Sequence, residues 1–484
     1  MNRFLNEMNK RENTTYTENG DVAYKTTYSG LVDLFALGGA YRNRTDAECI
    51  SLFKKAFAED ESWAMKCLFY LRDVRGGQGE RRFFRVIMHW LAENYPLAAR
   101  RNMEYIADFG RWDDLVYSFL NTPLEPVMVK MIKEQLAEDV KSEYPSLCAK
   151  WLPSANASSL ETKSAAKIIQ RRLGMTAKQY RKTLSSLRKK IKIVESFMSQ
   201  KNWDEIDFSK IPSRAGFLYS NAFLRREETS ERYMKFIKSK NTKVNAGVLY
   251  PYECVHKALD LLWWGSARNE EKIEVINKYW DNLKDYINNA KFNGIAVVDT
   301  SGSMSGRPIE VALSLGLYCA EKNKGEFKDK FITFSGRPEI VKIKGDTFFE
   351  KVSNMNKANW GFNTNIEKVY NLLLNIAVES GCSQEEIPQN LIIISDMQFD
   401  TGCVSGISTM KSAKQKWKDY GYTLPHLTFW NVDARHDSFP ALLSEDVTLI
   451  SGFSPVLFEQ VMQNKDTVEL MFEKLNKDRY KNIF

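Results

Sequence analysis

The stretch Ile295-Ala-Val-Val-Asp-Thr-Ser-Gly-Ser-Met-Ser305 determines how the second half of this 484-residue chain folds. Its apolar, β-branched start predicts a strand that is buried on both faces of a parallel sheet. Ligand sites in such sheets lie beyond the carboxyl ends of the strands, where Asp299, Ser301 and Ser303 follow with a spacing of two. One carboxylate and two hydroxyls form an oxygen-only set that suits Mg²⁺ or another small divalent cation.

Two later segments can complete the same site. Gly361-Phe-Asn-Thr-Asn365 is a polar loop that opens a predicted helix, and it contributes Thr364. Leu391-Ile-Ile-Ile-Ser-Asp396 repeats the pattern of a buried strand that ends in a carboxylate. Mg²⁺ is the expected ion, with Mn²⁺ and Ca²⁺ as alternatives. We therefore predict one metal site with the ligands Asp299, Ser301, Ser303, Thr364 and Asp396.

Other interpretations of the first loop fit the sequence less well. A nucleophile elbow requires G-x-S-x-G, but Met304 stands where the serine should be. A phosphate-binding loop ends in G-K-[ST], whereas Gly306 is followed by Arg307 and Pro308. A serine-rich turn that caps the next helix without binding a metal is the structural alternative.

Strand and helix patterns alternate from about Phe292 to the end of the chain. This alternation predicts an open, doubly wound α/β sheet with helices on both faces. The further predicted strands cover 330–334, 339–344, 391–395, 424–431 and 447–450, and the predicted helices cover 307–321, 366–378, 411–420 and 455–476.

The first half of the chain has helical rather than strand patterns. Residues 1–20 are polar and turn-rich, which predicts a flexible arm. From Tyr28 to about Ile287, short amphipathic segments follow one another, with a capping box at Thr45 and Glu48. Such segments predict helix pairs stacked as in a HEAT-like α-solenoid. The expected fold class is α plus α/β, with an arm over 1–20, a helical domain over 21–288 and an α/β domain over 289–484.

A glycine-rich break interrupts this helical region at Arg72-Asp-Val-Arg-Gly-Gly-Gln-Gly-Glu-Arg81. It follows a helix rather than a strand and lacks the G-x-G-x-x-G order, which argues against a phosphate cradle. We therefore interpret it as a tight turn between helices, with its arginines on a solvated surface. These arginines are Arg72, Arg75, Arg81 and Arg82.

Composition places the chain among soluble cytosolic proteins. No apolar run approaches the ~18 residues that a transmembrane helix needs, and the first residues lack the apolar core of a signal peptide. The seven cysteines are scattered without a C-x-x-C pair, which is typical of reduced, packing cysteines. We expect a cytoplasmic monomer without membrane contact.

Positive charge is concentrated in one region. The whole chain carries a net charge of +8, but residues 150–250 contain 22 Lys and Arg against 8 Asp and Glu. Such concentration favours a polyanionic partner bound by that region rather than a generally basic protein.

Within the basic region, Thr176 and Gln179 form a capping box that opens a predicted long helix. Its apolar face consists of Tyr180, Leu184, Leu187, Ile191 and Val194. Acidic residues are almost absent before Glu195, so salt bridges along the helix cannot be the main purpose of its basic residues. A solvated surface without a ligand is the alternative to nucleic-acid binding, which we favour. The candidate RNA-binding residues are Arg171, Arg172, Lys178, Arg181, Lys182, Arg188, Lys189 and Lys192.

The combination of motifs resembles a known arrangement. The D-x-S-x-S, T and D pattern is similar to the metal-ion-dependent adhesion site of von Willebrand factor A domains. A helical region followed by such a domain resembles the Ro autoantigen family, whose helical part is the TROVE domain, and still more its viral, plant and fungal relatives. The segments that carry the resemblance are Leu31-Val-Asp-Leu-Phe35, 71–81, Phe109-Gly-Arg-Trp-Asp-Asp-Leu115, Tyr180-Arg-Lys-Thr-Leu184, 298–305 and Ser451-Gly-Phe-Ser-Pro455.

The resemblance implies a ring of helical repeats closed by the A domain. In Ro, small structured RNAs bind the outer basic surface and single-stranded ends of misfolded RNAs enter the ring. The expected function is therefore that of a non-enzymatic ribonucleoprotein scaffold or RNA chaperone. A metal-dependent protein-interaction module, in which a partner supplies an acidic ligand to the metal, is the alternative. A metal-dependent nuclease fits less well, because two carboxylates are few for a two-metal site and no general base is evident.

Overall fold

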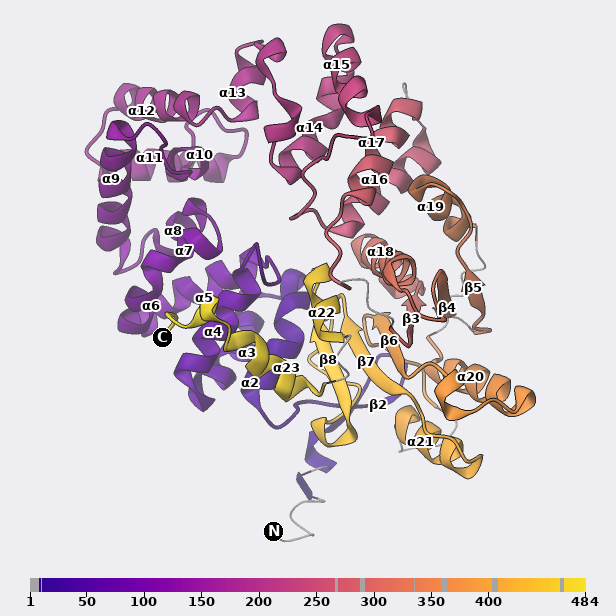
Figure 1. Ribbon diagram of the computed structural model, residues 1–484. Helices are drawn as coiled ribbons and strands as arrows, with labels where there is room; N and C mark the ends of the chain where they lie inside the picture. Colours follow the sequence, from indigo (N-terminus) through magenta and orange to yellow (C-terminus); the bar gives the residue numbers. More distant parts are fainter. Residues whose placement is uncertain are drawn as a thin grey trace. The chain divides into compact units, whose positions relative to one another are not determined.

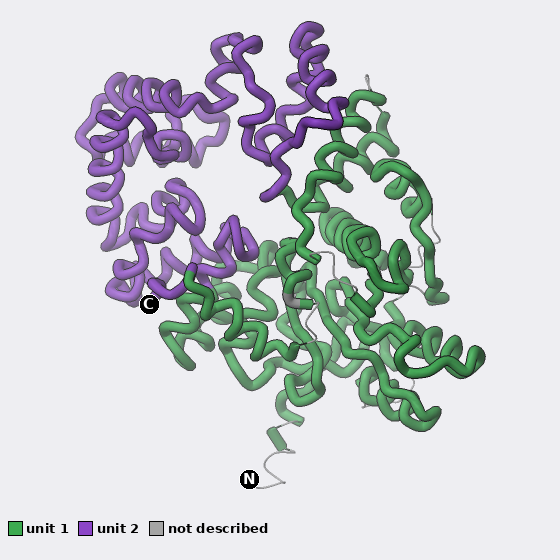
Figure 2. The backbone as a smooth tube through the Cα atoms, viewed as in Figure 1, with its two compact units in different colours: residues 1–67, 249–478 green, residues 68–248, 479–484 purple. Residues whose placement is uncertain are grey.

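The computed structural model describes residues 8–9, 11–265, 269–287, 292–334, 336–357, 364–402, 408–461 and 465–484. The chain forms two compact units (Figure 2). Unit 1 comprises residues 1–67 and 249–478, and unit 2 comprises residues 68–248 and 479–484. Each unit therefore combines two separate stretches of sequence. In the described ranges, no helix is long and apolar enough to cross a membrane.

A six-stranded sheet forms the centre of unit 1 (Figure 1). Its strand order is β5-β4-β3-β6-β7-β8, and every pair is parallel except β4 with β5. This order and the helical first half confirm the predicted fold class of α plus α/β. The strands are β3 (Gly294–Asp299), β4 (Lys330–Phe334), β5 (Ile340–Lys342), β6 (Asn390–Ser395), β7 (His426–Asn431) and β8 (Val447–Ser451).

The strand order reverses between β3 and β6. From β3 the chain crosses to β4 on one side, whereas from β6 it crosses to β7 on the other side. The loops that follow the two strands therefore run in opposite directions and leave a crevice between them. Open α/β sheets bind ligands in such a crevice. Val298 pairs with Ile394 in the register of these strands. Asp299 and Asp396 consequently lie at the same end of neighbouring strands, as the sequence predicted.

Both faces of the sheet are covered. Helix α18 (Arg307–Lys322) packs on β3, β4 and β6, and the rings of Tyr318 and Trp430 on this face contact Phe458. Phe399 contacts both Phe334 and Phe429. The further helices that follow β3 in unit 1 are α19 (Phe348–Asn356), α20 (Ile366–Ser380), α21 (Thr409–Asp419), α22 (Phe458–Val461) and α23 (Thr467–Leu475).

The N-terminal residues belong to this sheet unit rather than to a free arm. Strands β1 (Thr14–Tyr16) and β2 (Val22–Tyr24) form an antiparallel hairpin. The Thr17 hydroxyl donates to the Phe399 carbonyl oxygen at 2.6 Å, and the Tyr24 amide donates to the Phe439 carbonyl oxygen at 2.9 Å. The predicted flexible arm was wrong for these residues, because their polar groups bond to the sheet's loops instead of to water.

Helices of the N-terminal and middle segments, as far as the structure describes them, complete unit 1. Helix α2 packs against β8 and α23, and α16 packs on α18 and α19. These contacts explain why residues that precede the α/β segment belong to the same compact unit as that segment. The expected domain limits at 20/21 and 288/289 remain a prediction. The helices are α2 (Gly30–Leu37), α3 (Asp46–Glu59), α16 (Pro251–Trp264) and α17 (Asn269–Asp281).

Unit 2 is helical in its described residues. Its helices pack in pairs, such as α5 with α8, α11 with α12 and α14 with α15. Helix α4 (Glu61–Arg72) spans the division between the units. The helices of unit 2 are α5 (Arg81–Asn94), α6 (Pro96–Asn102), α7 (Ile106–Phe109), α8 (Trp112–Phe119), α9 (Glu125–Lys141), α10 (Cys148–Trp151), α11 (Leu160–Arg172), α12 (Ala177–Lys190), α13 (Val194–Ser199), α14 (Ser213–Leu224) and α15 (Glu227–Lys238).

A buried ion pair organises the glycine-rich break of unit 2. Arg72 is 1% exposed and donates from Nε and Nη2 to Asp114 Oδ2, at 2.9 and 2.6 Å. Arg85 Nε donates to the other oxygen of Asp114 at 2.7 Å. A Cβ atom at Gly110 would lie 2.4 Å from Asp114 Oδ2, so only glycine fits beside the pair. The prediction that Arg72 lies on a solvated surface was therefore wrong.

The ion pair generates a stability prediction. Asp114→Asn keeps the shape of the side chain but leaves the buried Arg72 guanidinium without a counter-charge. We expect the free energy of unfolding of unit 2 to fall by about 3–5 kcal/mol, the usual effect of breaking a buried pair. Urea denaturation followed by circular dichroism measures this change. Arg101→Gln, on an exposed side chain of the same unit, should stay within about 0.5 kcal/mol of wild type. Equal midpoints for the two variants would contradict the structural role of Asp114.

Candidate functional site

Asp299 is the buried centre of the predicted metal site. It ends β3 and is 0% exposed. Its Oδ1 accepts a hydrogen bond from the Ser301 amide at 2.9 Å, and its Oδ2 accepts one from the Ser395 hydroxyl at 2.5 Å. The Ser301 and Ser303 hydroxyl oxygens lie 3.0 Å apart. The spacing of two therefore brings the three oxygen-bearing side chains together, as the sequence predicted.

Asp396 supplies the second carboxylate. It directly follows β6 and is 1% exposed. Its Oδ1 accepts a hydrogen bond from the Gln398 amide at 3.2 Å, whereas its buried Oδ2 has no hydrogen-bond partner among the residues described. Such an orphaned oxygen in a dry environment is costly unless a cation or another donor reaches it.

Burial makes both carboxylates costly to ionise. Burial and, after it, the negative charge of Asp396 raise the pKa of Asp299 to about 7. Burial also raises the pKa of Asp396, although a hydrogen bond with the Ser303 side chain opposes this change. Two buried acids that repel each other are stabilised by a positive charge placed between them. The electrostatics of the site therefore favour a bound cation.

Thr364 does not join this set as a free ligand. Its hydroxyl oxygen accepts a hydrogen bond from Asn19 Nδ2 at 2.9 Å, and it lies 2.9 Å both from the Gln398 carbonyl oxygen and from Asp400 Oδ1. One hydroxyl has one proton and two lone pairs, so these three contacts leave little capacity for a metal. The structure brings Thr364 to the loop that follows Asp396 but engages it in protein contacts. The preceding residues Gly361–Asn363 lie outside the described ranges.

An arginine that the sequence analysis did not single out reaches the site. Arg435 Nε lies 3.9 Å from Asp396 Oδ2 and 3.3 Å from Asp433 Oδ2. Arg435 Nη2 also donates to the Ser303 carbonyl oxygen. Asp433 stands two residues after β7, near a strand end as Asp299 and Asp396 are, so the repeated pattern of a buried strand and a carboxylate could have revealed this part of the site.

The N-terminal segment forms part of the same region of the sheet. Asn19 Nδ2 donates to the Gln398 carbonyl oxygen at 2.8 Å as well as to Thr364. The Glu18 amide donates to Gln398 Oε1 at 2.9 Å, and Glu18 Oε1 lies 2.6 Å from His436 Nε2. Residues almost 400 positions apart in sequence therefore meet here. No local pattern in residues 17–21 indicates this partnership.

The residues fit a divalent cation in part. No three His, Cys, Asp or Glu side chains gather into a metal-binding group within the described ranges, so hydroxyls have to supply some of the ligands. Asp299, Asp396, Ser301 and Ser303 provide hard oxygen donors of the type that Mg²⁺ prefers. The orphaned Asp396 Oδ2 is the donor best placed to accept a cation. Thr364 would have to exchange a protein hydrogen bond for a ligand role.

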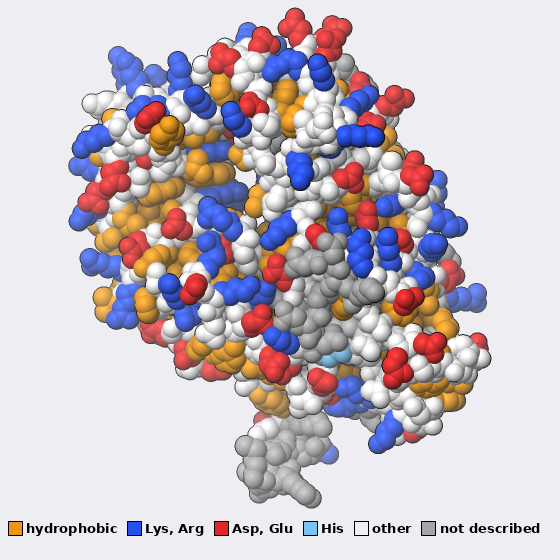
Figure 3. Space-filling model, viewed as in Figure 1, with side chains coloured by type: hydrophobic (Ala, Val, Ile, Leu, Met, Phe, Trp, Pro, Cys, Tyr) orange, Lys and Arg blue, Asp and Glu red, His pale blue; other side chains and the backbone are white. Residues whose placement is uncertain are grey.

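The predicted basic surface in unit 2 is largely exposed. Helix α12 buries Tyr180, Leu184 and Leu187, and its capping box at Thr176 and Gln179 is present. Lys and Arg side chains gather over α11 and α12 in Figure 3. Six of the eight candidate residues are exposed, and their side chains have no hydrogen bond or ion pair with any described residue: Arg171, Lys178, Arg181, Lys182, Lys189 and Lys192.

The remaining two candidates have protein partners. Arg188 donates to the carbonyl oxygens of Ala149 and Leu152 and to Ser154 Oγ, at 2.8, 3.0 and 2.8 Å. Arg172 Nε lies 2.5 Å from Glu125 Oε1. The choice of Arg188 as an exposed phosphate contact was therefore wrong, because burial against the 149–154 segment makes it a structural residue.

The end of α12 also differs from the prediction. The helix ends at Lys190, whereas the predicted apolar stripe continued through Ile191 to Val194. Lys192 lies in the turn after it with a φ of 54°. Lys192 is exposed but does not share the helical face of the other candidates.

Comparisons of the sequence with known proteins identify the family of this chain. The profile described as Domain of unknown function (DUF2828) matches residues 17–120 and 127–291, and the profile described as Domain of unknown function (DUF7788) matches residues 293–482. The chain belongs to the DUF2828 family. An uncharacterized protein of Acanthamoeba polyphaga mimivirus is 32% identical to it over 499 residues, covering 94% of this chain and 85% of the viral protein.

A solved structure is also similar to this DUF2828 protein. The crystal structure of the Deinococcus radiodurans Ro (RSR) protein matches 93% of this chain and 99% of its own, with 10% sequence identity and a TM-score of 0.47. Similarity at this level says nothing about function.

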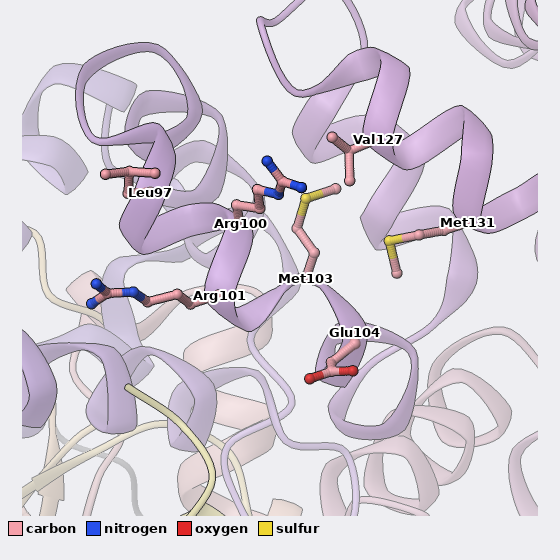
Figure 4. A pocket seen from close by; sticks show the side chains of 7 residues that line it. All are labelled: Leu97, Arg100, Arg101, Met103, Glu104, Val127 and Met131. Atoms are coloured by element: carbon pink, nitrogen blue, oxygen red, sulfur yellow. The ribbon is translucent and has the colours of Figure 1, made fainter.

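One described cavity of the DUF2828 protein combines charged and apolar walls but offers no catalytic arrangement. A cavity of about 550 Å³ in unit 2 lies between α6 and α9 (Figure 4). Its walls combine two guanidinium groups with apolar side chains, and Arg100 extends toward Val127 whereas Arg101 points away. The lining holds no Ser, Cys or His that could act as a nucleophile or base. It consists of Leu97, Arg100, Arg101, Met103, Glu104, Val127 and Met131.

The raised pKa of Asp299 generates a pH prediction for the metal-free protein. Between about pH 4 and pH 7 the folded state keeps a proton that the unfolded state has released. The free energy of unfolding of wild type therefore falls as pH rises through this window. Asp299→Asn removes that loss. The free energy of unfolding of the variant should therefore rise relative to that of wild type as pH rises, by up to about 1.4 kcal/mol for each unit by which the pKa is raised.

Thermal melts in excess chelator across this pH range measure the difference. A hydrogen bond lost in the variant adds an offset that does not change with pH. Asp419→Asn, at an exposed position, serves as the control. A constant gap between Asp299→Asn and wild type at every pH would contradict the raised pKa.

Proposed function

We propose that this protein is an RNA-binding protein, a non-enzymatic ribonucleoprotein scaffold or RNA chaperone of the cytoplasm. It would bind structured or misfolded small RNA through the exposed basic face of α11 and α12. The observation that carries this proposal is the set of six exposed basic side chains without a partner among the residues described.

The arrangement of α12 supports a polyanionic ligand. Lys178, Arg181, Lys182 and Lys189 follow one another at helical spacing, so they share one face of the helix. The buried Tyr180, Leu184 and Leu187 fix the opposite face against the protein. Like charges on one face repel each other unless anions approach them, and a phosphate backbone supplies regularly spaced anions.

The neighbouring helix extends the same charge. In α11, Lys167 and Arg171 are exposed one helical turn apart, and Lys163 is half-buried one turn before them. Glu161 is the acidic residue of this helix. Contacts of this kind hold a backbone without reading bases, so we expect affinity for RNA with little dependence on sequence.

An RNA titration tests this proposal. Replacing Lys178, Arg181 and Lys182 together by Gln should weaken all RNAs similarly and lower the slope of log affinity against log salt by about two to three. Fluorescence anisotropy at several salt concentrations measures both quantities. Lys133, Lys238 and Lys240 are exposed in or beside other helices of unit 2, and their triple Gln variant removes the same charge as a control. An unchanged slope in the α12 variant, or an equal fall in the control, would overturn the proposal.

A metal-dependent interaction with a protein partner is the second candidate function. The orphaned, buried Asp396 Oδ2 beside Asp299 favours it. Asp299, Ser301, Ser303 and Asp396 would hold Mg²⁺ or Mn²⁺, with Thr364 joining after exchange of a hydrogen bond. The bound cation would present a positive charge to an acidic side chain of a partner.

Divalent cations should therefore stabilise unit 1. At about 100 times the dissociation constant, a ligand that binds the folded state alone adds about 2.7 kcal/mol, which raises the melting temperature by several degrees. Asp396→Asn should remove the response in differential scanning fluorimetry. RNA affinity of this variant should stay at the wild-type value, because the basic face lies in α11 and α12. An equal melting response in wild type and variant would rule out Asp396 as a ligand.

A further inference from the structure

Arg435 connects three loops at the carboxyl ends of the strands. Its guanidinium contacts the Ser303 carbonyl oxygen after β3, Asp396 after β6 and Asp433 after β7. One positive charge thus stands among the groups that would surround a bound metal ion. A guanidinium has hydrogen-bond donors and no acceptor. It can therefore neutralise a carboxylate, but it cannot itself act as a ligand of a metal ion.

We propose that Arg435 is a built-in cation that competes with a divalent metal ion for Asp396. In the metal-free protein the guanidinium compensates the carboxylates, and a metal ion binds when the guanidinium leaves. This inference rests on the metal site proposed above. It adds that the chain itself sets the metal affinity of that site through the position of one side chain.

The contact with Asp396 is suited to such an exchange. The separation of 3.9 Å between Arg435 Nε and Asp396 Oδ2 gives charge compensation, but Asp396 Oδ2 accepts no hydrogen bond from a described residue. A full hydrogen bond would need a donor at about 2.7–2.9 Å. The carboxylate oxygen therefore keeps its lone pairs available for an ion that comes closer.

The backbone that carries Arg435 is held independently of its guanidinium. Asp437 accepts hydrogen bonds from the Tyr41 hydroxyl at 2.5 Å and from Arg44 Nη2 at 2.7 Å. His436 lies against Glu18, with 2.6 Å between Nε2 and Oε1. These contacts with the N-terminal segment hold the two residues that directly follow Arg435. The side chain can therefore change its rotamer without unfolding the loop.

Solvent is available to the displaced group. The Arg435 side chain is 37% exposed, whereas Asp396 is fully buried at its side chain. A guanidinium that turns outward regains water, and the metal ion takes over compensation of the buried carboxylate. The guanidinium brings one positive charge and a divalent ion brings two, so the ion can compensate both buried carboxylates, Asp299 and Asp396.

Direct Mn²⁺ binding to the full-length protein tests the competition. Isothermal titration calorimetry, supported by electron paramagnetic resonance of free Mn²⁺, should give Arg435→Gln an affinity about tenfold or more above wild type, within the usual range of coupling between two sites. Asp396→Asn should abolish binding in both backgrounds. Arg435→Lys, which retains a cation, should fall between wild type and Arg435→Gln. Lys418→Gln removes the same charge from an exposed position of unit 1 and should bind as wild type does.

The outcomes separate the competition from the metal site itself. If Arg435→Gln binds Mn²⁺ and wild type does not, the competition is supported, and Arg435 then prevents binding completely in wild type. Equal or weaker binding by Arg435→Gln, with Asp396→Asn inactive, would overturn the competition and leave the metal site intact. Absence of Mn²⁺ binding in wild type and in Arg435→Gln would overturn both. In excess chelator, Arg435→Gln should also melt below wild type, because Asp396 loses a compensating charge.

Discussion

Compensation of charge is the constraint on which both units depend. In unit 2 the protein compensates its own buried charges, since Arg72 and Asp114 neutralise each other in a pair for which Gly110 leaves room. Unit 1 meets this constraint less completely, since Asp299 and Asp396 are both buried and a half-exposed arginine stands at 3.9 Å from one of them. On the exposed face of α12, the positive charges of the candidate basic side chains have no acidic partner among the described residues. Places where the chain does not balance its own charge are the places where a ligand stabilises it.

The surroundings of the candidate metal site are not formed by the α/β segment alone. Its edge is lined by Asn19 and Glu18, which bond to the loop after β6, and by Tyr41 and Arg44, which hold the loop after β7. These residues precede the strands by more than 250 positions. The N-terminal segment therefore helps to hold the loops that surround this candidate site.

The parts of the fold that sequence could predict are those with a strong local pattern. The run before Asp299 and the run before Asp396 are apolar without interruption, and they form neighbouring buried strands with the carboxylates at one end. The stripe of Tyr180, Leu184 and Leu187 likewise fixes α12 and its exposed face. Periodicity of this kind depends on burial of one face, which is a local property.

The parts that could not be predicted depend on distant partners. Arg188 has the same local signature as Lys189, yet three acceptors in the 149–154 segment bury its guanidinium. Residues 13–20 have the composition of a free arm, but Thr14–Tyr16 pair with β2, and Thr17 and Glu18 bond to the sheet's loops. The pattern of β7 and Asp433 marks the loop of Arg435, but the contacts of Arg435 with Ser303 and Asp396 become visible only when the three strand ends are placed side by side. In each case the sequence shows the polar group and not its partner.

Ultraviolet cross-linking of the full-length protein to a bound small RNA tests the central claim most directly, with the cross-linked peptides mapped by mass spectrometry. The account predicts cross-links concentrated in residues 160–192, lost when salt is raised and unaffected by chelation of divalent metal. Cross-links confined to unit 1, or to helices of unit 2 other than α11 and α12, would contradict it.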